Sequence, residues 1–301
     1  MDFSETYIDL SSLDEFYDFE EDVVLDNSSG QIIKGDVSKL FENSESRNRV
    51  LRLQIEYDCE LENCEILKNF PNLDTVAIYG KRMKSLKGLE YLTKLDLLVL
   101  DFNRDENFDY SILSTLSLGR FEIDNVTPKA KQEISSGLLA KEIKIVGHDS
   151  GDLSYLINTG FESLEIGNGK FKNFEGLEKS RLRKLGFYTC KSLSSINIPE
   201  KLSVDFLEFE TCNKLNFDNI SKAVNCKSLR LSNCKAHFKL SSALSMDNLE
   251  RVVLNNTGVE LDWGNIQFKD SKLKEGYISP ISKGDFKRLE SYSGKIKWTR
   301  Y

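Results

Sequence analysis

The sequence predicts an α/β solenoid in which each repeat supplies one strand of a parallel sheet and one return segment. The first observation is a motif of two apolar residues separated by one residue, which occurs eleven times. The second is its spacing, because successive motifs follow at steps of 21 to 24 residues. A fixed period in this range is the signature of a repeat architecture. The pairs are Leu53/Ile55, Val76/Ile78, Leu98/Leu100, Phe121/Ile123, Ile143/Ile145, Leu164/Ile166, Leu185/Phe187, Leu207/Phe209, Leu229/Leu231, Val252/Leu254 and the weaker Gly276/Ile278.

Each motif is expected to form a short strand. Successive side chains of a strand alternate between its faces, so both apolar residues of a pair point inward and the middle residue points outward. Strands of successive repeats then stack into a parallel sheet, and the return segments build the opposite side. At the end of each strand the chain bends, and an inward side chain there meets unpaired backbone groups.

The fullest copy of the repeat reads Leu92-x-x-Leu95-x-x-Leu98-x-Leu100-x-x-Asn103. This pattern resembles the leucine-rich repeat family, in its short class of about 22 residues with degenerate copies of bacterial type. The resemblance implies a curved horseshoe with the parallel β-sheet on its concave face, an irregular or short helical convex side, and caps at both ends. We name the position five residues after the first member of each pair the ladder position, which the family fills with Asn or Cys.

The chain is expected to divide into three parts. Residues 1–48 form an N-terminal acidic cap of short helices and a hairpin, residues 49–281 form the solenoid of about eleven repeats, and residues 282–301 form the C-terminal cap. A cap covers the apolar end of a repeat array. Residues 1–33 hold ten acidic residues and no Lys or Arg, so a separate acidic binding arm is the alternative.

Two elements of the expected caps can be assigned more closely. In the N-terminal cap, a helix begins near Ser11 and a turn at residues 26–30 joins two strands, 23–25 and 31–33. In the C-terminal cap, the core is closed by Leu289, Ile296 and Trp298. These three apolar residues lie in the mildly basic stretch 270–301.

Three cysteines share the ladder position of consecutive repeats. Cys190, Cys212 and Cys234 are therefore expected to stack as small buried thiols at the inner turn. Cys226 occupies an apolar position and His148 a ladder position, which predicts burial for both. Two alternatives remain open. Cys212 and Cys234 with His237 give an incomplete soft metal site, and Cys59 with Cys64 gives a local pair.

The sequence offers little for catalysis. With only His148 and His237, no Ser-His-acid or Cys-His arrangement occurs at a recognisable spacing. Residues 167–169 read Gly-Asn-Gly but lack the third glycine of a phosphate loop. We therefore expect no enzyme and no catalytic, cofactor-binding or metal-binding residues.

Composition bears on the compartment and on the partners. No apolar run approaches the about 18 residues that a membrane span needs, and the first ten residues, MDFSETYIDL, lack the basic region of a signal peptide. A cytoplasmic protein that does not bind a membrane is therefore expected. The net charge of −7 argues against nucleic acid as a partner. The six cysteines are then expected to be free thiols.

The concave face is the expected binding site. Positions that point outward from the sheet carry many acidic residues and several large apolar ones, which are predicted to be exposed. Apolar and aromatic anchors surrounded by charge are typical of a protein-binding patch. The predicted partner-binding residues are Tyr79, Leu97, Val99, Asp101, Phe102, Glu122, Asp124, Glu165, Tyr188, Phe206, Glu208 and Glu210.

These observations predict a non-catalytic module, monomeric or weakly oligomeric, that binds another protein with a basic surface. The specific hypothesis is an immunity-type inhibitor that neutralises a basic toxin, because acidic residues would accelerate association with a basic partner. The alternatives are a cytosolic scaffold in a larger complex and, more remotely, an enzyme with a site near the Cys190–His237 stretch.

Overall fold

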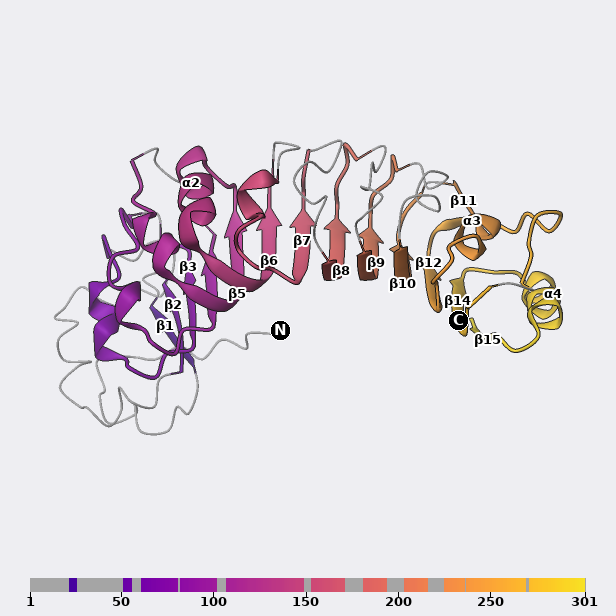
Figure 1. Ribbon diagram of the computed structural model, residues 1–301, viewed down its shortest axis with the longest axis horizontal. Coiled ribbons are helices and arrows are strands. Elements are labelled where there is room, and N and C mark those ends of the chain that lie inside the picture. The colour runs from indigo at the N-terminus through magenta and orange to yellow at the C-terminus, as the bar shows by residue number, and fades with distance from the viewer. Residues whose placement is uncertain are drawn as a thin grey trace. The chain divides into compact units, whose positions relative to one another are not determined.

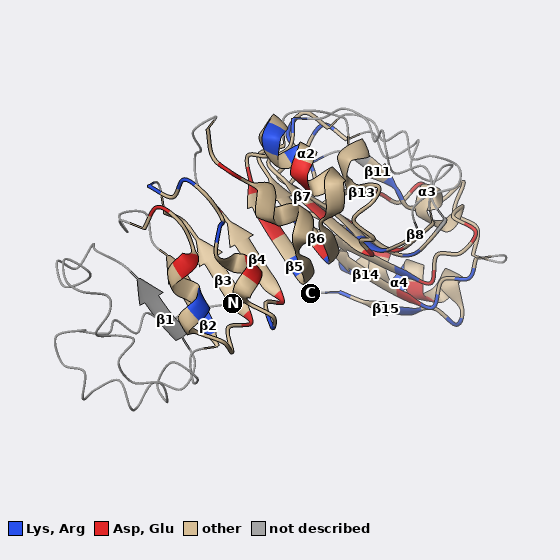
Figure 2. Cartoon of the chain, turned by 60° about the vertical axis from the view of Figure 1, so that its left-hand side comes forward, with Lys and Arg blue, Asp and Glu red and all other residues tan. Residues whose placement is uncertain are grey.

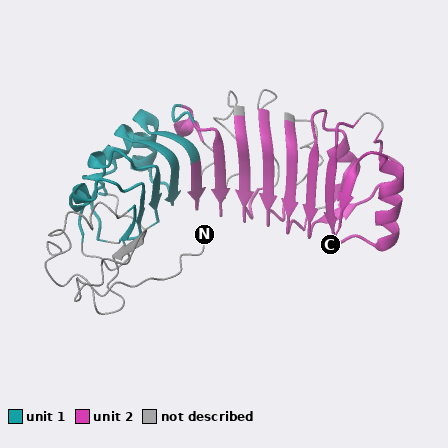
Figure 3. Ribbon diagram, turned by 90° about the horizontal axis from the view of Figure 1, so that it is seen from below, with its two compact units in different colours: residues 1–142, 158–160 teal, residues 143–157, 161–301 magenta. Residues whose placement is uncertain are grey.

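The computed structural model describes residues 22–25, 51–55, 61–80, 82–101, 107–148, 153–170, 181–193, 203–215, 225–235, 237–268 and 271–300. The chain divides into two compact units (Figure 3). Unit 1 comprises residues 1–142 and 158–160, and unit 2 comprises residues 143–157 and 161–301.

Unit 1 contains parallel strands in chain order, one before the first repeat and then one per repeat (Figure 1). They are β1 (Asp22–Leu25), β2 (Arg52–Ile55), β3 (Thr75–Ile78), β4 (Leu97–Leu100) and β5 (Ser117–Asp124), each hydrogen-bonded to the next. Strand β6 (Leu139–Val146) contributes residues to both units. A strand is present where residues 23–25 were expected to form one side of a hairpin, but it pairs in parallel with β2. The helix near Ser11, the turn at 26–30 and the strand at 31–33 lie outside the described residues.

Unit 2 continues the same pattern of parallel pairing. Its strands are β7 (Ser163–Gly167), β8 (Arg181–Tyr188), β9 (Ser203–Glu210), β10 (Asn225–Ser232), β12 (Arg251–Asn255), β14 (Glu275–Ser279) and β15 (Lys297–Thr299). Each pairs in parallel with the next in this order. The period of the sequence motif therefore corresponds to one strand of the sheet.

The core of each unit lies against one face of its strands. Every member of the eleven apolar pairs is buried, from Leu53 in β2 to Ile278 in β14. We call the opposite face of the strands, toward which the middle residues of the pairs point, the outer sheet face. The alternation predicted from the sequence is confirmed, because only this register buries both apolar residues of each pair.

The return segments are short and varied. They include the 3₁₀ helices η3 (Glu65–Asn69), η4 (Leu89–Tyr91), η5 (Ser111–Thr115) and η6 (Ser154–Leu156), and the α-helices α2 (Pro128–Gly137) and α3 (Leu240–Leu244). Thr127 caps α2, since its hydroxyl accepts the Ala130 N–H at 3.2 Å. In unit 2 two return segments also pair, as β11 (His237–Lys239) and β13 (Gly258–Glu260) form a small parallel sheet.

The expected C-terminal core residues close one end of unit 2. Helix α4 (Lys283–Ser293) is followed by β15, which pairs with β14. Leu289 and Trp298 are buried and Ile296 is half-buried. The indole N–H of Trp298 donates to Ser293 Oγ at 2.9 Å, so the ring is both packed and hydrogen-bonded. Within the described ranges, none of the helices has the length and apolar character that a membrane crossing requires.

Candidate functional site

In unit 1 the outer sheet face carries an apolar patch beside an ion-paired cluster. Leu97 and Val99 are half-buried, and the parallel register sets them beside Arg120 and Glu122. Arg120 Nε lies 2.7 Å from Glu122 Oε1, and its Nη1 lies 3.5 Å from Glu142 Oε2. The full exposure expected for Leu97 and Val99 is wrong, because strands about 4.8 Å apart bring neighbouring side chains over them. The carboxylate of Glu122 is likewise already ion-paired, with Arg120.

Three further predicted residues lie near the carboxyl ends of strands in unit 1. Tyr79, Asp101 and Asp124 are half-buried. Asp101 makes no ion pair with a residue that the structure describes, so its carboxylate remains available for a partner. Phe102 lies outside the described residues. Figure 2 shows that basic and acidic residues occur together along the strands. The pairing of Arg120 with Glu122 and Glu142 makes the charge of this face mixed rather than uniformly acidic.

In unit 2 the central feature of the outer sheet face is a buried carboxylate. Glu208 was expected to be exposed, but only 5% of it is accessible, which corrects that prediction. The hydroxyl of Tyr188 donates to Glu208 Oε2 at 2.8 Å, and Lys184 Nζ lies 3.4 Å from the same oxygen. Arg230 Nε lies 3.3 Å from the other oxygen, Oε1. These three side chains surround the carboxylate and take the place of its hydration.

Gly186 makes this arrangement possible. It lies two residues before Tyr188 on β8 and directly beside Glu208 in the register. A Cβ atom at position 186 would lie 2.9 Å from the Tyr188 hydroxyl oxygen and 3.1 Å from its Cζ. The tyrosine ring therefore lies across the glycine and reaches the next strand.

Lys184 links the charges of the cluster to its rings. Its Nζ lies 2.5 Å from Glu165 Oε1, 5.7 Å from the ring centre of Tyr188 and 5.8 Å from that of Phe206. Partial burial acts to lower the pKa of Lys184, but hydrogen bonds to Glu165 and Tyr188 raise it above its usual value. Burial raises the pKa of Tyr188 as well. Both groups therefore stay protonated at neutral pH.

The predicted residues of unit 2 are thus largely brought together. One cluster spanning β7 to β10 contains Glu165, Tyr188, Phe206 and Glu208. Glu210 lies opposite Tyr188 in the register of β8 and β9. We call this cluster, with Lys184, Gly186 and Arg230, the Tyr188 platform. Sequence reasoning missed Gly186 and Arg230 as site residues, and the signal available was a glycine at an outward strand position.

The thiol ladder lies on the inner side of unit 2. Cys190, Cys212, Cys234 and Cys226 are buried, as predicted, and so is His148. The ladder thiols donate to backbone carbonyls of the preceding repeat, Cys190 to Ile166, Cys212 to Phe187 and Cys234 to Phe209, at 3.4, 3.5 and 3.6 Å. These contacts give the thiols a structural role.

The other cysteine interpretations can be compared with the described part of the chain. No group of three His, Cys, Asp or Glu residues suited to a metal occurs among the described residues. The side chain of His237 lies outside them. Cys64 is a buried free thiol, and Cys59, its alternative partner, lies outside the described residues.

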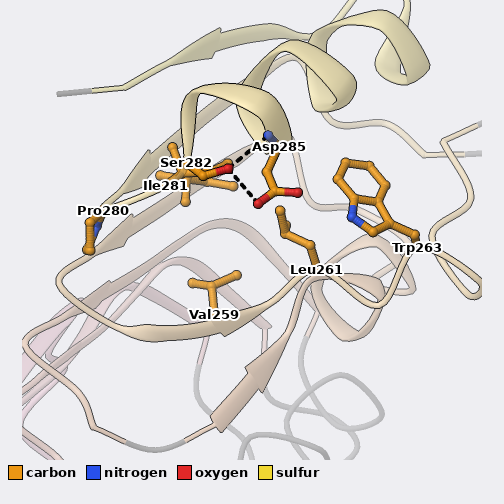
Figure 4. A pocket seen from close by; sticks show the side chains of 8 residues that line it. Val259, Leu261, Trp263, Pro280, Ile281, Ser282 and Asp285 are labelled. Atoms are coloured by element: carbon orange, nitrogen blue, oxygen red, sulfur yellow. Dashed lines mark hydrogen bonds between the residues drawn. The ribbon is translucent and has the colours of Figure 1, made fainter.

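A pocket of about 330 Å³ lies in unit 2 away from the sheet face (Figure 4). The hydroxyl of Ser282 accepts the Asp285 N–H at 3.0 Å and donates to its carboxylate at 2.7 Å. This bonding caps α4, so it has a structural explanation. None of the predicted site residues lines the pocket, whose walls are Val259, Leu261, Trp263, Ile278, Pro280, Ile281, Ser282 and Asp285.

One comparison with a curated protein supports the interpretation of the repeat. No protein-family model matches the chain. It is 27% identical over 222 residues to Toll-like receptor 4 of Equus caballus, a match that covers 70% of this chain and 25% of that protein. The chain therefore spans about a quarter of the length of this curated relative. A solved structure of a leucine-rich-repeat protein of Leptospira interrogans is similar with a TM-score of 0.31 and 13% identity, over 93% of this chain and 89% of that one.

The sequence period, the single parallel strand in each repeat and the buried ladder all agree with the match to the curated relative. Chains of this kind are in general protein-binding modules, since stacked repeats present an extended surface. Together these findings show that the chain has the repeat and the parallel-sheet fold of leucine-rich-repeat proteins.

Proposed function

We propose that this chain is a non-catalytic module that binds another protein on its outer sheet face. The observation that carries the proposal is the set of half-buried apolar side chains, Leu97, Val99, Tyr188 and Phe206, among ordered charged groups. Apolar anchors surrounded by polar groups are the usual composition of an interface hot spot.

More specifically, we propose an immunity-type inhibitor that neutralises a basic protein toxin in the cytoplasm. Support comes from two acidic residues of unit 1, Asp101 and Asp124, which lie on its outer sheet face. The buried free thiols of the chain suit a reducing compartment. A scaffold that recruits its partner through apolar contact alone is the alternative.

The experiment places a photo-crosslinking amino acid at Val99 and, as a matched control in the same unit, at Tyr91. Tyr91 is 54% exposed and ends η4 in a return segment. Crosslinking in cells of the source organism should trap one protein from position 99 and not from position 91. Equal capture from both positions, or none from 99, contradicts binding by the outer sheet face.

Charge reversal separates the inhibitor from the scaffold once the captured protein has been purified. For an inhibitor of a basic protein, Asp101→Lys with Asp124→Lys should weaken binding more than tenfold, and the association rate should fall steeply with salt. For a scaffold, binding should survive the reversal and be lost in Leu97→Ala. Titration calorimetry and stopped-flow fluorescence measure the two quantities.

A further inference from the structure

The Tyr188 platform has an unusual arrangement of charge. Glu208 is almost fully buried on a face that otherwise carries accessible charged residues. A buried charge costs free energy unless it is paired and hydrogen-bonded. Each of its two oxygens holds a different group, the Tyr188 hydroxyl at 2.8 Å and Arg230 Nε at 3.3 Å. The carboxylate therefore fixes a ring on one side and a guanidinium on the other.

Both contacts that hold the Arg230 side chain are made by its Nε. Its Nε also donates to Ser232 Oγ at 3.2 Å, so both contacts of the guanidinium use the same nitrogen. The two terminal nitrogens make no hydrogen bond to a residue that the structure describes, and 45% of the side chain is accessible. A guanidinium held at Nε offers two parallel N–H groups, the geometry that recognises a carboxylate.

The acidic residues of the platform are already paired. Glu165 lies 2.5 Å from Lys184, and Glu208 faces both Lys184 and Arg230. The four charges balance, so the platform itself does not attract a second cation. The available donors belong to Arg230, and the available apolar surface belongs to the half-buried rings of Tyr188 and Phe206.

We propose that the Tyr188 platform binds a carboxylate side chain of the partner protein, with an adjacent apolar side chain of the partner resting on Tyr188 and Phe206. This inference rests on the proposed function and names the chemistry of one contact within it. The platform is ordered before binding, because Gly186 and Glu208 hold its groups in place. Little conformational freedom is then lost when the partner binds.

The test uses small probes, so it does not depend on finding the partner. The Nε–Hε signal of Arg230 is followed by nuclear magnetic resonance in the full chain and assigned by its absence in Arg230→Lys. The probe is acetyl-Phe-Glu-amide, and the matched probes are acetyl-Phe-Gln-amide, acetyl-Phe-Lys-amide and inorganic phosphate. We expect the Glu peptide to shift this signal in a saturable way. The affinity of the Gln and Lys peptides should be at least tenfold lower.

Two variants locate the effect. Gly186→Val displaces the Tyr188 ring and should weaken binding of the Glu peptide. Arg251→Gln, on the same sheet face in β12, should leave it unchanged. Equal shifts with the Glu and Gln peptides overturn the proposal, as does an equal response to phosphate, which would show a general anion site. If the peptide binds but Val99 captures no protein, the proposed function fails and the site stands as a peptide-carboxylate site alone.

Discussion

Tyr188 shows how one residue depends on the absence of a side chain at another. The ring crosses Gly186, donates to Glu208 and lies within 5.7 Å of the Lys184 ammonium. A hydrogen bond to a charged acceptor contributes about 1.5–3 kcal/mol when the alternative is an unsatisfied buried group. The bond therefore stabilises unit 2 as well as orienting the ring.

The raised pKa values of Tyr188 and Lys184 predict a loss of stability at alkaline pH. The unfolded chain releases these protons near pH 10, whereas the folded chain retains them to higher pH. The stabilisation is therefore fully present below about pH 10 and falls as the pH rises beyond it. Urea titrations at pH 8, 9, 10 and 11 should show a smaller decline in Tyr188→Phe than in the wild-type chain.

Tyr292→Phe is the matched control for this experiment, since Tyr292 is 63% exposed. It should decline with pH as the wild-type chain does. If Tyr188→Phe loses the same stability as the control between pH 9 and 11, the buried phenol does not contribute.

At the scale of the repeat, five strands of unit 2 (β7, β8, β9, β10 and β12) end in a turn with a left-handed residue. Asn168, Thr189, Thr211, Asn233 and Asn256 have φ angles from 49° to 56°, and each precedes a ladder position. Their N–H groups donate to the last strand carbonyl of the following repeat, as in Thr211 to Ser232 at 2.9 Å. Asn tolerates this region, whereas a β-branched residue is strained there.

Thr211→Asn should therefore stabilise the chain. The left-handed conformation costs about 1–2 kcal/mol for most residues and less for Asn, so a gain of about 1 kcal/mol is expected. Urea unfolding followed by circular dichroism measures it. The control is Thr115→Asn, at an exposed position in η5 without a positive φ, which should change stability little. An equal effect in both variants contradicts the turn explanation.

The ladder position tolerates different side chains that make the same bonds. Thr257 fills it after β12, and its hydroxyl donates to Leu231 O at 3.3 Å, much as Cys234 donates to Phe209 O at 3.6 Å. Cys234→Thr should therefore change the free energy of unfolding by less than about 1 kcal/mol. Cys234→Ala removes the donor and leaves a cavity, so it should cost about 1–3 kcal/mol. A Thr variant as unstable as the Ala variant would contradict the proposed bonding.

Elements with a strong local pattern could be predicted from the sequence, and elements fixed by tertiary contact could not. The apolar pairs and the ladder thiols are buried as expected, because alternation and period alone decide their direction. The burial of Glu208 depends on the ring of Tyr188 from β8 and the guanidinium of Arg230 from β10. The spacing of residues in the sequence does not predict this arrangement. Strands β11 and β13 lie in neighbouring return segments and pair in parallel. No sequence motif predicts this pairing.

At the scale of the whole molecule, Trp298 covers one end of the core of unit 2. Trp298 packs where a side chain of residue 276 would otherwise lie, since a Cβ there would be 2.1 Å from the indole ring. This explains why the last apolar pair, Gly276/Ile278, looks weak in the sequence. The ring covers the end of the core of unit 2.

Trp298→Ala should cost about 3–5 kcal/mol, the usual range for removing a buried aromatic ring. Since stability in a repeat protein passes between neighbours, hydrogen exchange should accelerate most in β14 and β12 and least in β2 and β3. Uniform acceleration throughout both units would contradict a local end effect. Trp263→Ala, at a half-buried indole in the same unit, serves as the control and should cost less.

The indole over Gly276 also bears on how such a chain changes during evolution. Copies of the repeat upstream of β14 meet the same backbone donors and acceptors on each side, so a duplicated copy there finds its bonds ready. A copy inserted between β14 and β15 has to displace Trp298 and needs a new glycine beneath it. Gains and losses of whole repeats are therefore expected among the upstream strands, where they alter the width of the outer sheet face and leave the contact of Trp298 with Gly276 unchanged.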